Sequence, residues 1–246
     1  MNMKVDLCGV TLNNPVMTAS GTFGSGAEYA EFVDLNKLGA VVTKGVANVP
    51  WPGNPTPRVA EVYGGMLNAV GLQNPGIDLF VERDIPFLKQ FDTKIMVNVC
   101  GHSTEEYIEV VERLRDQPVD LLEINISCPN VKEGGIAFGQ DPKAVEAITK
   151  EMKKHAAQPV IMKLSPNVTD ITEMARAAEA GGADGLSLIN TITGMKIDIN
   201  RQKFVLANKT GGMSGPAIHP VAVRMVYQTA QAVRLPIVGI DRKSVV

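Results

Sequence analysis

A stretch in the middle of the chain, EINISCPNVKEGG (residues 123–135), combines residue types that could do chemistry at close spacing. Its apolar, β-branched run climbs to Cys128 and breaks at once into a Pro-Asn pair, so a strand would end there by presenting one thiol. A free cysteine is more often a small buried hydrophobic residue. Here the polar neighbours Asn125 and Ser127 favour a working thiol, and a thiol of pKa ~8.5 acts as a general base once partly ionised. We therefore predict Cys128 as the catalytic residue.

Polar residues recur at the ends of the other strand-like runs. The runs cover residues 16–20, 40–45, 94–100, 121–127, 159–165, 185–190 and 236–240. Near their ends stand Ser20, Lys44, Gly45, Asn98, Asn125, Lys163, Asn190 and Thr191. Packing alone gives apolar strands no reason to end repeatedly in such residues, so their convergence on one face predicts a pocket. The two lysines suit an anionic ligand or a cofactor that gains negative charge, and the asparagines suit an amide-like ring.

The elements that position these residues alternate between strands and helices. The runs lack strict alternation, as expected for strands covered on both faces. Helix starts are readable at Ser103, Asp141, Asp170 and Pro220. In the helix that begins at Pro220, we expect one face to carry Val223, Val226, Tyr227 and Ala230. This order predicts an α/β fold with a parallel sheet, either open or closed as a barrel.

Two segments, 46–92 and 191–217, interrupt the alternation and are rich in proline or glycine. We expect long functional loops there, since loops after the carboxyl ends of barrel strands carry the chemistry. Within the second, TGGMSG (210–215) reads as a glycine loop ahead of a helix whose backbone N–H groups could bind phosphate. With no linker or repeat in view, we predict a single domain over residues 1–246.

Composition narrows the class of protein. The chain has 246 residues, close to the ~250 typical of one β/α barrel. Lys plus Arg number 24 and Asp plus Glu 26, a net charge of −2 without a basic stripe, which argues against nucleic-acid or membrane-surface binding. Three scattered cysteines and three histidines show neither a disulfide framework nor metal-ligand spacing. With no secretory signal and no apolar run near ~18 residues, we expect a cytoplasmic protein.

Several ordered motifs resemble dihydroorotate dehydrogenase, and more narrowly the catalytic subunit of its NAD-linked class 1B. They are ASGTFGSG, TKG, NAVGLQNPG, NISCPNVKEGG with FGQDP, KLSPN, NT and LANKTGGMSGPAI, and the resemblance runs to about residue 239. It implies a TIM (β/α)8 barrel that holds FMN at the mouth formed by the carboxyl ends of its strands. It also implies oxidation of (S)-dihydroorotate to orotate in pyrimidine biosynthesis.

The resemblance also implies roles for individual residues. Cys128 would take a proton from dihydroorotate while a hydride passes to the flavin. The implied substrate-binding residues are Lys44, Asn68, Ala69, Val70, Gly71, Leu72, Asn125, Asn190 and Thr191. The implied FMN-binding residues are Ser20, Lys44, Gly45, Asn98, Asn125, Lys163, Ile189 and Gly215. Lys163 would stabilise negative charge on the reduced flavin.

A partner follows from the same resemblance. Class 1B enzymes pass electrons to NAD⁺ through a second subunit that carries FAD and a 2Fe–2S cluster. This chain has no cysteine spacing for such a cluster. We therefore expect that electron-transfer subunit as a partner, with a homodimer of this chain inside a heterotetramer.

The last residues depart from the family pattern. After LPIVGI the relatives carry a Gly-Gly pair, a helix, an eighth strand and a last helix, whereas this sequence reads DRKSVV. Asp241 and Arg242 stand where the resemblance places glycines that donate N–H groups to the FMN phosphate. We expect a truncated barrel that lacks its eighth strand and last helices, binds FMN poorly and is impaired as an enzyme.

Three alternatives stay open from the sequence. A flavoenzyme similar to dihydropyrimidine dehydrogenase would turn over dihydrouracil instead of dihydroorotate. A Schiff-base lyase would use Lys163 as its amine and would be trapped by borohydride with a carbonyl substrate. An inactive fragment that survives as a partner-binding remnant would show no flavin absorbance after purification.

Overall fold

A six-stranded parallel sheet forms the centre of the computed structural model, which describes residues 2–127 and 135–240. The predicted catalytic residue Cys128 and the divergent pair Asp241 and Arg242 lie outside the described residues. The strands run in the order β14 (Ile237–Gly239), β9 (Gly185–Leu188), β8 (Val160–Lys163), β7 (Leu121–Asn125), β6 (Lys94–Val99) and β3 (Ala40–Val42). Neighbouring strands in space are thus successive strands of the β/α alternation, as in the wall of a TIM barrel. The fold is α/β, as predicted.

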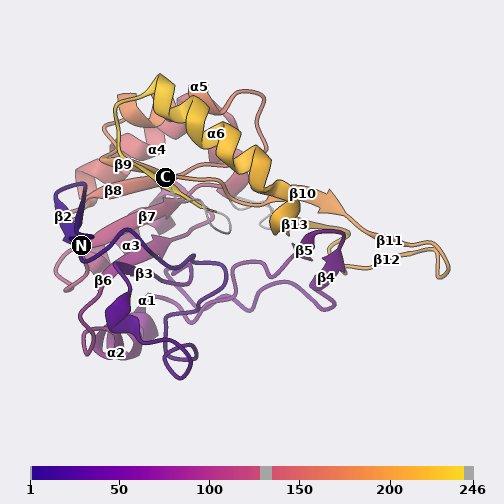
Figure 1. Ribbon diagram of the computed structural model, residues 1–246, viewed down its shortest axis with the longest axis horizontal. Coiled ribbons are helices and arrows are strands. Elements are labelled where there is room, and N and C mark those ends of the chain that lie inside the picture. Colours follow the sequence, from indigo (N-terminus) through magenta and orange to yellow (C-terminus); the bar gives the residue numbers. More distant parts are fainter. Residues whose placement is uncertain (1, 128–134, 241–246) are drawn as a thin grey trace.

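Four longer helices cover the outer face of this sheet: α3 (Thr104–Leu114), α4 (Pro142–His155), α5 (Ile171–Ala180) and α6 (His219–Ala232). Each packs against the next along the chain (Figure 1). The N-caps Ser103, Asp141 and Asp170 each accept a hydrogen bond from a backbone N–H of the first turn. These side chains satisfy donors that a helix start otherwise leaves unpaired. The three predicted starts are confirmed, and α6 begins one residue before Pro220.

Hydrophobic layers pack against both faces of the parallel sheet. The outer layer fills the space between strands and helices, and it includes Leu122 and Ile124 of β7. The inner layer lies on the opposite face of the sheet, and it joins Leu121 of β7 to Leu7 and Leu12. The last two residues belong to an N-terminal hairpin formed by β1 (Val5–Leu7) and β2 (Val10–Leu12). This hairpin therefore covers apolar surface inside the curved sheet.

Shorter elements complete the connections. They are the 3₁₀ helices η1 (Leu35–Lys37), η3 (Gly135–Gln140) and η4 (Pro216–Ile218), the helices α1 (Ile77–Leu79) and α2 (Ile85–Leu88), and the π-helix η2 (Phe80–Asp84) between them. The predicted first strand at 16–20 is reduced to one parallel bridge, from Met17 to Ala40. That bridge adds one position beside β3 at the edge of the sheet.

The two segments predicted as long loops instead build a second sheet, so that prediction is wrong in part. Its order is β10 (Ile192–Met195), β13 (Thr210–Ser214), β5 (Gly65–Asn68) and β4 (Val59–Val62), all antiparallel. The hairpin of β11 (Ile197–Asp198) and β12 (Lys203–Phe204) projects beyond it, away from the parallel sheet (Figure 1). β5 and β13 come from different segments and pair with each other, so neither segment reveals the sheet on its own.

Two further expectations are corrected. Residues 210–214 do not form a loop, because they form β13 and pair with strands on both sides. The buried face of α6 carries Ala222, Met225, Val226 and Thr229, whereas Val223 and Tyr227 are exposed. Both faces of this helix offer apolar residues at helical spacing, so the contact with the sheet decides which one is buried.

Candidate active site

On the inner face of the parallel sheet, neighbouring strands carry a layer of polar side chains. This layer lies next to the inner hydrophobic layer, nearer the carboxyl ends of the strands. Side chains alternate between the two faces of a strand, so Leu121, Glu123 and Asn125 of β7 share the inner face. The register sets Asn98 opposite Glu123, and it sets Lys163 opposite Asn125. Because the same alternation places Leu121 in the inner hydrophobic layer, Glu123 and Asn125 lie on that face, nearer the carboxyl end of β7. The register then places the side chains of Asn98 and Lys163 beside them.

A buried ion pair lies at the centre of this layer. The Nζ atom of Lys163 is 3.5 Å from Oε2 of Glu123, and the two residues are 5% and 1% exposed. Lys163 Nζ also donates to Ser20 Oγ at 3.1 Å. The Glu123 carboxylate accepts from Asn98 Nδ2 on one oxygen and from Ser187 Oγ, at 2.7 Å, on the other. Burial of two opposite charges is tolerated because both are paired and hydrogen-bonded.

A chain of amide and hydroxyl contacts extends from the ion pair toward the strand ends. Asn125 Nδ2 donates to Asn98 Oδ1 at 3.3 Å, and Ser127 Oγ donates to Asn125 Oδ1 at 3.0 Å. Asn190 Nδ2 then donates to Ser127 Oγ at 2.8 Å and to its carbonyl oxygen at 3.1 Å. The hydroxyl of Tyr107, from α3, donates to the Asn125 carbonyl at 2.7 Å. One network thus fixes the backbone and side chain of the residue that precedes Cys128.

Gly45 lies close against the Asn98 amide. A Cβ at this position would lie 3.1 Å from Asn98 Oδ1 and 3.3 Å from both Cys100 Sγ and Leu72 Cδ2. Cys100 and Leu72 pack with Trp51 in a small hydrophobic cluster next to it. A side chain at position 45 would therefore crowd the amide and the apolar cluster, and glycine lets these groups lie directly against the backbone.

The structure brings together half of the residues that the sequence predicts for the site. Contacts or close approach join Ser20, Gly45, Leu72, Asn98, Asn125, Lys163, Asn190 and Thr191 to the network or its apolar wall. The buried Ile189 follows β9, and the half-buried Lys44 follows β3. The remaining predicted residues, Asn68, Ala69, Val70, Gly71 and Gly215, lie in or beside the antiparallel sheet. The roles of all the predicted site residues stay predictions.

Four members of the network were not predicted as site residues: Tyr107, Glu123, Ser127 and Ser187. A signal for Glu123 exists in the sequence, because a carboxylate stands in a Leu/Ile strand two residues before Asn125, and therefore on the same face. Tyr107 and Ser187 carry no such signal. Their partners are 18 and 64 residues away in the chain.

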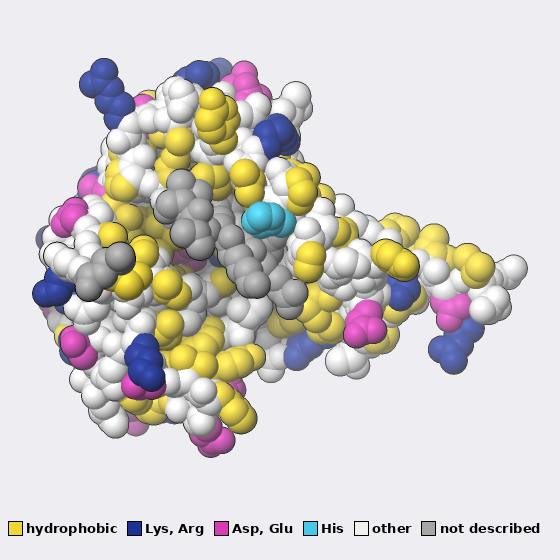
Figure 2. Space-filling view, in the orientation of Figure 1, with side chains coloured by type: hydrophobic (Ala, Val, Ile, Leu, Met, Phe, Trp, Pro, Cys, Tyr) yellow, Lys and Arg dark blue, Asp and Glu magenta, His cyan; other side chains and the backbone are white. Residues whose placement is uncertain are grey.

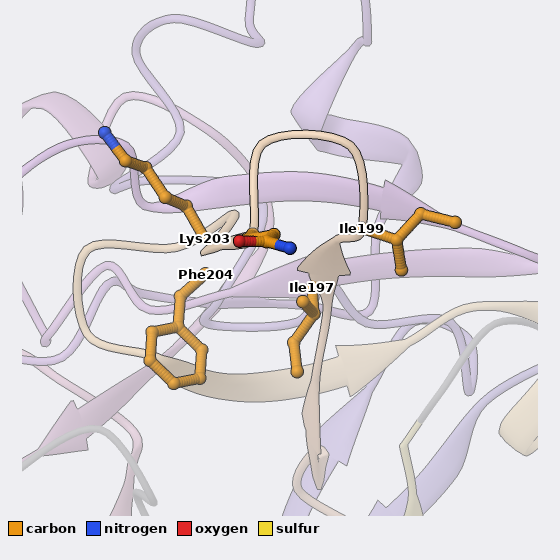
Figure 3. Close-up of a pocket in the computed structure, with 5 residues that line it drawn as sticks. Ile197, Ile199, Lys203 and Phe204 are labelled. Carbon is orange, nitrogen blue, oxygen red and sulfur yellow. The ribbon is translucent and has the colours of Figure 1, made fainter.

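The hairpin of β11 and β12 offers a different kind of surface. Ile197, Ile199, Gln202, Lys203 and Phe204 line a shallow hollow there, and their side chains spread apart without converging on a common point (Figure 3). Apolar side chains gather along the projecting sheet and hairpin (Figure 2). Ile199 is 82% exposed. This surface lacks the buried polar groups that distinguish the network at the strand ends.

The described residues offer neither a membrane-spanning helix nor a metal-binding cluster. None of the helices described here combines the length and the apolar character needed to cross a membrane. Within residues 2–127 and 135–240, no group of three or more histidine, cysteine or acidic side chains is arranged to hold a metal ion.

Parallel strands, covering helices and a buried polar network at the carboxyl ends define an enzyme of the β/α-barrel class. The sequence profile of the dihydroorotate dehydrogenase family matches residues 2–241. The chain belongs to this family.

Individual relatives are similar to this chain over almost its whole length. The protein of Lachnoclostridium phytofermentans named dihydroorotate dehydrogenase B (NAD(+)), catalytic subunit, is 75% identical over 239 residues, which cover 97% of this chain and 80% of the relative. Proteins of the same name from Alkaliphilus metalliredigens and Geobacter sulfurreducens are 68% and 57% identical, and each match covers 97% of this chain and 79% of the relative. A structure of DHODH from Eimeria tenella, in complex with ferulenol, superposes with a TM-score of 0.76. At 21% identity, over 98% of this chain and 73% of that one, it supports the fold.

The described residues fit the flavin that this family uses. An isoalloxazine ring is flat, offers acceptors and donors along one edge, and gains negative charge when reduced. Lys163 supplies a buried positive charge, and Asn98 and Asn125 supply amides. This donor set suits a ring of this kind.

Proposed function

We propose that this chain is the catalytic subunit of an NAD⁺-linked dihydroorotate dehydrogenase, which oxidises dihydroorotate to orotate in pyrimidine biosynthesis. Identity of 75% across 97% of the chain to a protein of that name carries the proposal. The buried network at the strand ends supports it, because it offers the charge and amides that an anionic, amide-containing ring requires.

FMN, when bound, would accept the hydride that leaves the substrate. Lys163 and Asn98 would hold its ring, with Ser20, Gly45, Ile189 and Gly215 around it. Lys44 would meet the substrate carboxylate, and the amides of Asn125 and Asn190 would orient its ring, with Thr191 beside them. Residues 68–72 would complete the substrate pocket. The apolar wall of Leu72 and Trp51 would exclude water from the reacting atoms.

Cys128 would remove the proton from the carbon next to the one that loses hydride. The network supports this role through Ser127, whose side chain and carbonyl are held by Asn125 and Asn190. A general base is useful only within hydrogen-bond reach of its proton, so a rigid attachment point favours catalysis.

The name of the relatives includes the words catalytic subunit, which implies another subunit. We propose that it carries FAD and a 2Fe–2S cluster and takes electrons from this chain to NAD⁺. The assembly would be a heterotetramer in the cytoplasm, built around a dimer of this chain.

The proposal is tested by orotate formation. Purified chain supplied with excess FMN, dihydroorotate and a dye acceptor should form orotate at a reduced rate, because Asp241 and Arg242 are expected to weaken FMN binding. Cys128→Ala should abolish steady-state turnover near neutral pH and still bind flavin, because the base is lost and the ring site is kept. Cys8→Ala, which removes a thiol of the N-terminal hairpin, is the matched control and should keep turnover.

The same preparation separates the rival activities. Turnover of dihydrouracil without orotate formation would instead favour the dihydropyrimidine dehydrogenase alternative. Borohydride trapping of a carbonyl compound on Lys163 would favour the lyase. Full turnover by Cys128→Ala would refute the assigned base.

A further inference from the structure

Glu123 stands where packing alone would favour an apolar side chain. It occupies the middle of β7 between Leu122 and Ile124 and is 1% exposed. Nevertheless both of its carboxylate oxygens are engaged, one by Asn98 and Lys163 and the other by Ser187. A buried carboxylate is costly unless it is paired, so its presence is explained by its partners and not by volume.

The partners come from three other strands, and their side chains converge on this carboxylate. Lys163 and Asn98 are the ones that face the proposed flavin site, and both contact the same oxygen, Oε2. The geometry also balances charge, because the buried ammonium of Lys163 lies 3.5 Å from a carboxylate that is buried with it. A ring that contacts Lys163 would therefore meet a cation whose field is reduced by the carboxylate behind it.

We propose that Glu123 is a positioning residue for the reaction proposed above, on which this inference rests. It holds the Lys163 ammonium and the Asn98 amide in place, and its negative charge limits the positive charge that Lys163 presents to the bound flavin. Glu123 acts through these two residues and does not contact the substrate.

Glu123→Gln separates charge from shape. Glutamine has almost the same volume, and its oxygen can still accept from Asn98. Its NH₂ group can donate to Ser187 Oγ, because a hydroxyl accepts as well as it donates. The variant therefore keeps the hydrogen bonds and removes the charge. Ser187→Ala is the matched control, since it removes a neutral partner of the same carboxylate and keeps every charge.

The first measurement needs no cofactor. Thermal unfolding of the chain without flavin is compared for Glu123→Gln, Lys163→Met and the double variant. Each single change leaves one buried charge unpaired and should lower Tm, and the double variant should lose less than the sum of the two. Ser187→Ala combined with Lys163→Met should depart less from additivity, because Ser187 carries no charge. If the Tm losses of Glu123→Gln and Lys163→Met simply add in the double variant, Glu123 does not hold Lys163 in place and the proposal is overturned.

The second measurement is the midpoint potential of bound FMN, which a purely structural role of Glu123 would leave unchanged. Glu123→Gln should shift the potential to more positive values, because the unbalanced ammonium favours the more negative, reduced ring. Glu123→Asp, which keeps the charge, should shift it less, and Ser187→Ala should leave it near that of the parent chain. An unchanged or more negative potential in Glu123→Gln would overturn the charge-balancing role.

The two measurements also separate this inference from the proposed function. If the parent chain forms no orotate but the unfolding cycle shows coupling, the proposed reaction fails and the pairing stands. If orotate forms and the cycle is additive, the reaction stands and the role of Glu123 fails.

Discussion

Asn125 is the residue at which the network of the candidate site branches. Its amide contacts Asn98 on one side and Ser127 on the other. Its carbonyl oxygen accepts from the hydroxyl of Tyr107, a side chain that is fully buried in α3. A helix on the outer face of the sheet therefore helps to fix a group on the inner face, and polar networks of this kind make a core rigid when they are satisfied.

Tyr107→Phe tests this contact at the residue scale. The change removes one hydroxyl and retains the ring, so we expect a loss of about 1 kcal/mol in the free energy of unfolding. Denaturant titration measures it. Tyr227→Phe, at a position that is 66% exposed, is the matched control and should be neutral. Equal stability of both variants would mean that the Tyr107 hydroxyl does not support Asn125.

At the scale of elements, the starts of the helices that cover the parallel sheet are set by residues close to them in the sequence. α5 begins at Asp170, whose carboxylate accepts from the backbone N–H of Thr172 at 2.8 Å. Hydrogen bonds with the side chain and the backbone of Thr172 lower the pKa of Asp170 from its ordinary value of 3.8. A carboxyl group with a lowered pKa in the folded state stabilises the fold above its ordinary pKa and loses that effect as the pH falls.

Replacement of this cap gives a prediction with a defined sign. Asp170→Ala should lower Tm by a few degrees near neutral pH, because the first turn of α5 loses its acceptor. The difference from the parent chain should shrink as the pH falls below about 3.8. Asp170→Asn keeps an acceptor that does not titrate, so its Tm difference from Asp170→Ala should persist in acid. A difference between the parent chain and Asp170→Ala that does not change with pH would contradict the role of the charge.

On the scale of the whole molecule, the N-terminal hairpin is joined to a strand far along the chain. Cys8, in the turn between β1 and β2, donates from Sγ to the carbonyl oxygen of Asp184 at 3.3 Å. Burial raises the pKa of the Cys8 thiol to about 11, and the nearby carboxylates of Asp184 and Asp6 add to the effect. The folded chain thus retains this proton at a pH at which the unfolded chain, with a thiol pKa near 9.0, loses it.

The pH dependence of stability that Cys8 contributes has a defined sign. The stability associated with the neutral thiol is complete below pH 9.0 and declines as the pH rises toward about 11. After allowance for solvent screening of a half-buried group, we expect a decline of about 1 kcal/mol. Denaturant titrations across this window should show a smaller decline for Cys8→Ala than for the parent chain. Parallel curves for the two proteins would refute this contribution.

The sequence by itself determined the parts of the protein that short windows encode. Apolar runs predicted the six strands of the parallel sheet, capping residues predicted the helix starts, and polar residues such as Asn125 and Lys163 marked the strand ends where the network forms. The motifs were also sufficient to indicate the family, because they preserve residue types in order along the chain.

Only the tertiary structure decided how distant segments meet. It paired β5 with β13 across more than a hundred residues, selected the buried face of α6, and joined Glu123 to Lys163 and Ser187. The physical reason is that side-chain period is local, whereas strand register and the choice of a buried face depend on surfaces from remote parts of the chain.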